Sequence, residues 1–452
     1  MDYFPRIVSW NVTGACHLRC PHCYLDARRR WPGELTTGEA LRLIEEMAEA
    51  GTELLILTGG EPLLRKDLPV LASHAASKGI APVLGTTGTL IDRHKAKMLK
   101  ESGVAAAGIS IDSIVPAKHD AFRGIPGSWH RAVAGIEACR AEGLEVLVHT
   151  TALKMNQEEV PRLVAFANEH GARAFHLFFL VCTGRGEQLT DLSPHEYEQM
   201  LNFVLDAQDR YPEMMVRARC APYIGRLAVE REAPIMGSAG CLAGTSYCRI
   251  APNGDVTACP YLPTVAGNVR SSSFQEIWRS SPVLSRFRRP QLQLGGKCGG
   301  CPLSQGDEPI CVGCRARAYA LVGDDIAADP WCLYEPNQER AVAVNVPAAA
   351  NSSSQAGVPW TEEAEERLRR VPFFIRGRVR QSAEAYVRQH GLLLVTPEVL
   401  ILLRQRVYGD SSPAEAHTLA GRVPRSLNGG ETLRTEETGA VKNRALTEED
   451  FT

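Results

Sequence analysis

Residues 6–26, RIVSWNVTGACHLRCPHCYLD, join a β-rich run to a loop that holds Cys16, Cys20 and Cys23. Five similar β-rich runs follow, at 53–60, 80–87, 107–112, 145–153 and 173–181. Helix-like stretches such as 36–51 and 128–143 lie between them, and this alternation predicts a parallel sheet covered by helices. Six such units are fewer than the eight of a closed barrel, so we expect an α/β fold with a partial, TIM-like (βα)6 barrel.

The length of 452 residues predicts several domains. We place the partial barrel at 1–225 and a region rich in cysteine and glycine at 226–343. The composition of 344–359, VNVPAAANSSSQAGVP, is typical of a linker. A small helical domain is expected at 360–408. The polar tail, 409–452, is expected to be disordered.

Charge and hydropathy exclude two classes of partner. The net charge of −2 argues against a protein that binds nucleic acid by neutralising phosphates. The apolar run 392–403 is too short to span a bilayer and is broken by Thr396, Pro397 and Glu398. The first residues lack the features of a signal peptide, so we expect a cytoplasmic protein without a membrane partner. Its 14 cysteines are then expected to be metal ligands or catalytic groups, because the cytosol keeps thiols reduced.

The three-cysteine loop directly follows the first strand, where ligands bind in barrels of this class. A structural zinc ion takes four protein ligands, and only His17 and His22 are available in the loop besides the thiols. Three thiolates suit a 4Fe–4S cluster with one iron left open to a ligand.

This loop, with C-x3-C-x2-C spacing followed by Tyr24, resembles that of the radical S-adenosylmethionine (SAM) superfamily. TGGEP (58–62) resembles the segment that meets the SAM amino group, and ISIDS (109–113) resembles the ribose-contacting segment. The resemblance covers 6 to about 340. It implies a cluster on Cys16, Cys20 and Cys23 that cleaves SAM, after one-electron reduction, to a 5′-deoxyadenosyl radical. The SAM contacts that it implies are Tyr24, Gly59, Gly60, Glu61, Pro62, Ser110 and Asp112.

Individual residues qualify this resemblance. Gly59 and Gly60 allow close approach of the backbone to a ligand, and Glu61 can pair with an ammonium group. Thr87 stands where the family often has asparagine. For Asp112, a cap of a turn remains an alternative to a SAM contact.

Eight later cysteines form a second pattern. Two C-x2-C pairs indicate metal binding, and two four-cysteine zinc sites are one interpretation. Asn253-Gly254 predicts a tight hairpin. The region also resembles the SPASM extension of radical SAM enzymes, which implies two auxiliary 4Fe–4S clusters. In chain order, the ligands would be Cys241, Cys248, Cys259 and Cys314 for the first cluster, and Cys298, Cys301, Cys311 and Cys332 for the second. The spacing around Cys311 departs from the common pattern.

The remaining cysteines are less informative. Cys139 is expected in the core, and Cys220 has no partner at metal-binding spacing. Cys182 and Arg185 lie at the end of the sixth strand in FFLVCTGRGE (178–187). The catalytic residues are unknown from sequence, with these two as candidates: Arg185 to bind a carboxylate, Cys182 to quench a radical or to act as a ligand. His176 is a core or a functional residue.

FFLVCTGRGE and CVGCRARAYALVGD (311–324) resemble radical SAM enzymes that trim haem precursors in the haem d1 and siroheme-dependent pathways. Those substrates carry carboxylates, which Arg315 and Arg317 can bind unless they pair with acids of the chain. Residues 360–408 read as three short helices and resemble a small domain of light-independent protochlorophyllide reductase. They are also consistent with a module that docks a protein partner.

The prediction is therefore a radical SAM enzyme that takes electrons from a low-potential donor and modifies a tetrapyrrole side chain. Modification of a peptide, or maturation of a metal cofactor, remains a second possibility. The third possibility is a non-catalytic iron–sulfur or zinc protein.

Overall fold

The computed structural model describes residues 3–189, 192–233, 240–306, 309–335, 358–369, 373–390 and 392–408. Its centre is a ten-stranded sheet with the order β10-β9-β8-β1-β2-β3-β4-β5-β6-β7. The six predicted strands are present as β1 (Ile7–Thr13), β2 (Leu54–Gly59), β3 (Ala81–Thr86), β4 (Ala106–Ser110), β5 (Glu145–Ala152) and β6 (Ala174–Phe179). They pair in parallel, each with the next, and the sheet does not close on itself. The predicted α/β partial barrel is confirmed.

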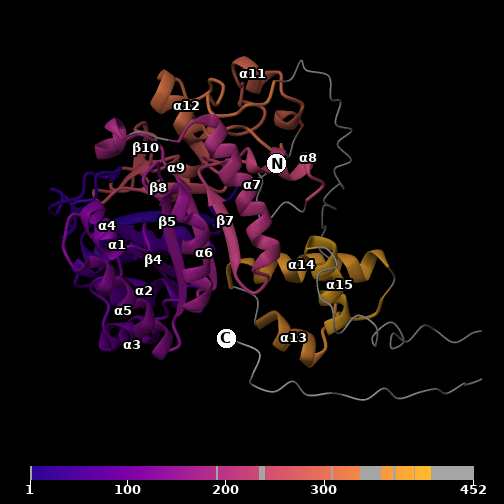
Figure 1. The fold of residues 1–452 in the computed structure, drawn as a ribbon, viewed down its shortest axis with the longest axis horizontal. Helices are drawn as coiled ribbons and strands as arrows, with labels where there is room; N and C mark the ends of the chain where they lie inside the picture. Colours follow the sequence, from indigo (N-terminus) through magenta and orange to yellow (C-terminus); the bar gives the residue numbers. More distant parts are fainter. Residues whose placement is uncertain are drawn as a thin grey trace, which may run out of the picture. The chain divides into compact units, whose positions relative to one another are not determined.

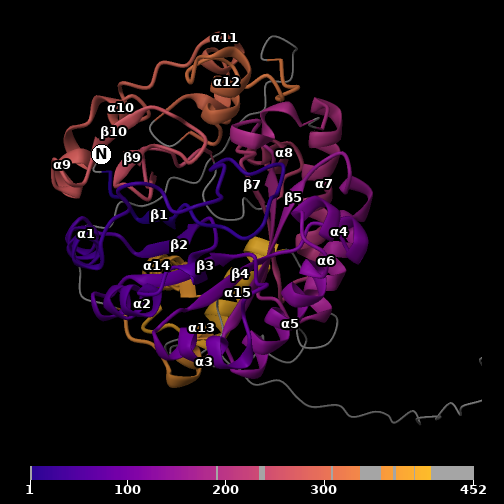
Figure 2. The same cartoon turned by 90° about the vertical axis from the view of Figure 1, so that its left-hand side faces the viewer.

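Helices cover the outer face of these strands, as Figure 2 shows. They are α1 (Thr37–Glu49), α2 (Leu68–Ser77), α3 (Arg93–Glu101), α4 (Pro116–Arg123), α5 (Ser128–Ala141) and α6 (Val160–Glu169). Thr36 caps α1 in a capping box with Glu39, where Thr37 was the cap that the sequence suggested. Such a box satisfies two backbone N–H groups that the helix leaves unpaired. It requires a glutamate or glutamine three residues after the cap, and Glu39 stands at that distance from Thr36.

The sheet extends beyond the six predicted strands at both ends. Helix α7 (Pro194–Arg210) leads to a seventh parallel strand, β7 (Met215–Arg219), and α8 (Ile224–Glu230) follows it. β8 (Tyr247–Ile250) pairs in parallel with β1 on the opposite side. The predicted boundary at 225–226 falls within α8. The strands β7 and β8 are short and carry arginines, so their sequences lack the apolar pattern of the other strands.

The cysteine-rich region continues the same sheet. The predicted hairpin at Asn253-Gly254 joins β8 to β9 (Asp255–Thr257), and β10 (Val265–Asn268) pairs antiparallel with β9. Short helices follow: α9 (Phe274–Ser280), α10 (Pro282–Ser285), α11 (Gly296–Gly299) and α12 (Arg315–Val322). Several apolar side chains of this region, among them Phe274, Trp278 and Phe287, join the main buried core of the barrel.

We call the inner face of the curved sheet the lumen face. Near the N-terminal ends of the strands, this face is filled by a cluster of apolar side chains, which we call the apolar plug. Val83, Ala106, Leu147, Ala174 and Met215 from five neighbouring strands form this buried cluster. Side chains alternate between the two faces of a strand, so residues two and four positions later face the same side. The plug therefore fixes which residues of β3 to β7 face the lumen above it.

Residues 358–408 contain the three predicted helices, α13 (Glu362–Arg369), α14 (Phe373–Gln389) and α15 (Pro397–Tyr408), shown in Figure 1. Thr361 caps the first, since its hydroxyl accepts from the Ala364 N–H at 3.1 Å. A small apolar core includes Ala383, Val387 and Val395. Pro372 and Gly391, which by residue type suggest helix ends, lie outside the described residues, as do most of the predicted linker and the tail 409–452. Within those residues, we found no helix long and apolar enough to cross a bilayer.

Candidate functional site

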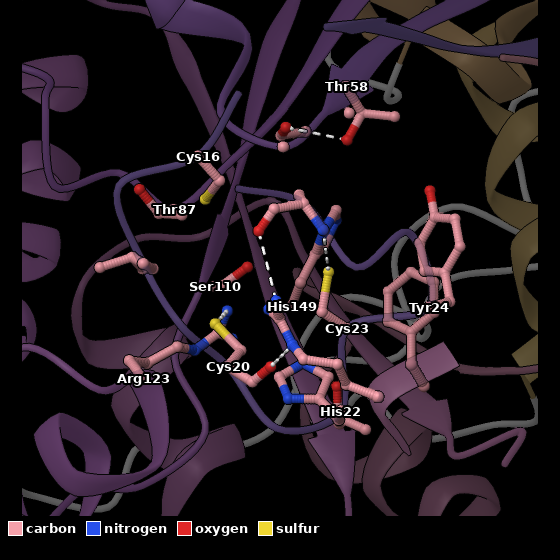
Figure 3. Close-up of a pocket in the computed structure, with 18 of the residues that line it drawn as sticks. Cys16, Cys20, His22, Cys23, Tyr24, Thr58, Thr87, Ser110, Arg123 and His149 are labelled. Carbon is pink, nitrogen blue, oxygen red and sulfur yellow. Dashed lines mark hydrogen bonds between the residues drawn. The ribbon is translucent and has the colours of Figure 1, made fainter. Parts of the chain in front are cut away.

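A cavity of about 210 Å³ lies at the C-terminal ends of the strands. Its lining includes all three cysteines of the first loop, which project into the same space in Figure 3. Of the SAM contacts that the sequence predicts, Tyr24, Gly59, Gly60 and Ser110 also line the cavity. Segments that are distant in sequence thus meet at one point, because the ends of parallel strands share one edge of a sheet.

The backbone of the cysteine loop is held in place by Arg185. Its Nε donates to the Cys20 carbonyl at 3.0 Å, and its Nη1 donates to Asp26 Oδ1 at 2.8 Å. The Arg185 N–H also donates to the Cys23 carbonyl at 3.1 Å. Although it lines the cavity, the guanidinium of Arg185 is engaged by the protein itself. Cys182 is half-buried and is not part of the cavity lining.

Arg123, at the end of α4, is a further residue of the site that no sequence motif pointed to. It is buried, with Nη1 3.7 Å from Cys20 Sγ, and it forms an ion pair with Asp112. Burial raises the pKa of the Cys20 thiol, and the charge of Arg123 opposes that rise. Burial also acts to raise the pKa of Asp112, but the Arg123 guanidinium, two nearby histidines and the Thr151 N–H together lower it.

Asp112 lies behind the cavity lining. Its Oδ1 accepts from the Thr151 N–H at 2.9 Å, which joins the ends of β4 and β5. A contact between Asp112 and SAM stays a prediction, whereas its contacts within the protein position Arg123.

Glu61 is fully buried and supports the turn after β2. One carboxylate oxygen accepts from the Thr86 hydroxyl at 2.7 Å, and the other accepts from the Thr87 N–H and hydroxyl at 2.9 and 2.7 Å. Thr87, which replaces the family's asparagine, lines the cavity. Pro62 begins a short 3-10 turn, Pro62–Leu64, capped by Glu61. These contacts are all within the protein, so the pairing of Glu61 with the ammonium group of SAM stays a prediction.

The geometry fits a cluster and SAM at this loop. A Cβ on Gly60 would lie 2.1 Å from the Ala15 carbonyl oxygen, so only glycine permits this approach of the turn to the loop. Burial raises the pKa of Cys16 to about 12, a cost that binding to a metal centre offsets. The Tyr24 hydroxyl accepts from Asn11 Nδ2 at 2.8 Å, which fixes the ring at the edge of the cavity.

The four cysteines predicted for the second auxiliary cluster come together. Cys298, Cys301, Cys311 and Cys332 line one pocket. Backbone N–H groups of Asp329 and Gly313 donate to the sulfur atoms of Cys298 and Cys311 at 3.4 and 3.3 Å. Arg315 lies beside this pocket, with Nη2 4.0 Å from Cys298 Sγ.

The other predicted set is brought together only in part. Burial raises the pKa of Cys259, and the neighbouring thiols of Cys241, Cys220 and Cys314 raise it further. Cys248 is buried on β8, and the charge that acts on its thiol is that of Arg288. The structure thus places Cys220, for which spacing gave no signal, among the thiols where Cys248 was expected.

Arg317 is buried beside this group and pairs with Asp329 at 3.6 Å. Its Nη2 also donates to the Cys220 carbonyl at 3.0 Å. Neither Arg315 nor Arg317 lines the cavity, so the alternative that they serve the protein's own packing fits their contacts.

Comparison with known proteins agrees with this geometry. Residues 10–167 match the radical SAM superfamily, 241–302 match the SPASM iron-sulfur cluster-binding domain, and 360–404 match the proto-chlorophyllide reductase 57 kD subunit. The first two matches imply 4Fe–4S clusters and the binding of SAM. The crystal structure of Streptococcus suis SuiB has the same fold, with a TM-score of 0.60 and 18% identity over 74% of this chain and 78% of SuiB.

Among curated relatives, the AdoMet-dependent heme synthase of Methanosarcina barkeri is 39% identical over 75% of this chain and 99% of its own length. The pre-heme d1 synthase of Dinoroseobacter shibae is 32% identical over 72% of this chain and 85% of its own. The PqqA peptide cyclase of Xanthomonas axonopodis pv. citri is 29% identical over 80% and 96%. The chain therefore belongs to the radical SAM superfamily, as a SPASM-containing enzyme of the group that includes the AdoMet-dependent heme synthases.

Proposed function

We propose that this enzyme modifies a carboxylate-bearing side chain of a haem-precursor tetrapyrrole. The observation that carries the proposal is the match to AdoMet-dependent heme synthase, 39% identical over 99% of that protein's length. The cavity is compatible with an acidic substrate, because no aspartate or glutamate is among the described residues that line it. Substrate carboxylates would therefore meet no like charge at its wall.

The residues of the chain have distinct roles in this proposal. Cys16, Cys20 and Cys23 would hold the cluster, while the close turn at Gly59 and Gly60 would admit SAM. When bound and reduced by a low-potential donor, the cluster and SAM supply a 5′-deoxyadenosyl radical for hydrogen abstraction. The apolar Phe178, Leu180 and Val181 in the cavity wall would keep water from that position.

The later cysteines are proposed to bind two auxiliary 4Fe–4S clusters. Cys298, Cys301, Cys311 and Cys332 would hold one of them. For the other, the neighbouring thiols favour Cys220, Cys241, Cys259 and Cys314, in place of the set with Cys248. Full ligation by cysteine favours a role of both clusters in electron transfer.

A peptide substrate is the second candidate, favoured by the match to PqqA peptide cyclase at 29% identity. Anaerobic titration of the reconstituted enzyme with iron coproporphyrin III separates the two, with an unrelated acidic peptide as competitor. A tetrapyrrole enzyme should shift the Soret band at stoichiometric porphyrin and resist the peptide. A Soret band that stays unshifted both with iron coproporphyrin III and with a siroheme-derived precursor would remove the tetrapyrrole as substrate.

A further inference from the structure

Arg219 is the last residue of β7 and faces the lumen. Met215, four residues earlier, belongs to the apolar plug, and alternation along the strand turns Arg219 to the same face. Parallel pairing sets Arg219 beside Phe178 of β6, and Phe178 lines the cavity. The strand thus carries a cation toward the side of the cavity that lies away from the cysteine loop of β1. Arg219 is not itself among the lining residues, and it lies next to one of them, Phe178.

The guanidinium of Arg219 differs from those of the other interior arginines. Arg123 pairs with Asp112, and Arg317 pairs with Asp329. Arg219 is only partly exposed, yet its side chain has no hydrogen bond or ion pair with any residue that the structure describes. Burial of a charge without a partner is unfavourable, so this position suits a residue that receives an anion from outside the chain.

The side chains of Cys220 and Tyr247 act on the charge of Arg219, and two histidines lie on the same face of the sheet. The rings of His149 and His176 stack at 5.1 Å, and His149 lines the cavity. Burial lowers the pKa of His149 to about 3, and the charge of Arg219 contributes. The same two causes lower the pKa of His176. Both imidazoles are therefore neutral near pH 7, and they neither repel nor neutralise an anion bound by Arg219.

These imidazoles also offer hydrogen-bonding capacity. The Nε2 atoms of His149 and His176 are buried without a hydrogen-bond partner in the described part of the chain. Gly108 makes space for the first ring, since a Cβ there would lie 2.2 Å from His149 Cε1. A planar anion with two oxygens can be bound by the Arg219 fork while the imidazoles contact its edge.

We propose that Arg219 binds a carboxylate of the substrate through a bidentate contact at the lumen side of the cavity, next to His149. The inference rests on the proposed function, in which the substrate carries several carboxylates. It moves carboxylate recognition from Arg185, whose guanidinium holds the cysteine loop, to a residue on β7. Arg219 is then a residue for substrate binding and orientation, not for SAM cleavage.

The test compares two porphyrins that differ at the side-chain carboxyl groups, which are free in one and methyl-esterified in the other. Iron coproporphyrin III carries four propionates, and its tetramethyl ester carries none. Each is titrated anaerobically, by the Soret band, into the reconstituted full-length wild type, Arg219→Gln and Arg219→Lys. Iron content and SAM cleavage without porphyrin are measured for each variant as controls of folding and cluster loading.

Arg219→Gln should weaken binding of the acid at least tenfold and leave that of the ester within twofold. Arg219→Lys keeps the positive charge but not the two-pronged guanidinium, so it should weaken binding of the acid less than Arg219→Gln does. If Arg219→Gln loses its iron, the comparison of acid and ester binding in Arg219→Lys tests the inference instead. Equal effects on acid and ester, or no effect on either, would overturn the inference. If the wild type binds neither these porphyrins nor a siroheme-derived precursor, both the inference and the proposed function fail. If acid binding depends on Arg219 but the porphyrin mass never changes, only the proposed function fails.

Discussion

The close approach of Gly60 to the cysteine loop gives a prediction with a defined magnitude. In Gly60→Ala, the new Cβ would lie 2.1 Å from the Ala15 carbonyl oxygen, whereas ordinary contacts begin at 3.4 Å. The turn and the loop must then separate by about 1.3 Å, a displacement on the scale that costs enzymes about 100-fold in rate. The overpacking itself should cost about 1–3 kcal/mol of stability.

The assay is anaerobic formation of 5′-deoxyadenosine, alongside iron content and the melting temperature. We expect at least about a 100-fold slower rate, with the protein still folded at 25 °C. Gly38→Ala is the matched control, because its new Cβ would meet nothing nearer than Arg42 Nη1 at 3.9 Å, and it should retain the wild-type rate. A wild-type rate in Gly60→Ala, at normal iron content, would refute the role given to this turn.

Three further predictions concern other parts of the chain. Arg185→Lys loses the fork that holds the loop, so it should lower iron loading of the Cys16 cluster; normal loading with a raised KM for substrate would instead restore Arg185 as a substrate ligand. Cys220→Ala should lose about four irons per chain and Cys248→Ala should lose none, by iron and sulfide analysis; the opposite order would return Cys248 to the ligand set. Burial and then the charge of Arg123 lower the pKa of His119 to about 4, below its unfolded value of 6.5, so stability present above pH 6.5 is lost as pH falls. From pH 6.5 to 5, urea titrations should show wild type losing about 1.5 kcal/mol more than His119→Gln, and equal losses would show that His119 is not held neutral.

Strand positions were predictable because the buried strands β1 to β6 have strong apolar runs bounded by helix signals. β7 was not, since MVRAR exposes arginines on its lumen face and looks like a surface segment. In a sheet that curves around a polar cavity, such residues face inward, and only the packing of Met215 in the plug reveals it. The same strand carries Arg219, so missing β7 also meant missing a candidate for substrate binding.

Motifs located the cysteine loop and the TGGEP turn, because spacing along one loop encodes their geometry directly. The spacing of residues along the chain could not predict which side chains from distant segments come together in the folded protein. Cys220 reaches Cys241 and Cys259 from a different element, and Arg185 and Arg123 reach Cys20 from helical segments far away in the sequence. A guanidinium can bind substrate or the protein's own backbone, and only its contacts distinguish the two.

The central claim, radical chemistry on a tetrapyrrole, is tested most directly by one anaerobic reaction. The reconstituted enzyme is incubated with SAM, a strong reductant and iron coproporphyrin III or a siroheme-derived precursor, and products are followed by liquid chromatography–mass spectrometry. The account predicts that the tetrapyrrole accelerates 5′-deoxyadenosine formation and loses mass from a carboxylate side chain. Formation of 5′-deoxyadenosine with every tetrapyrrole unchanged would contradict it.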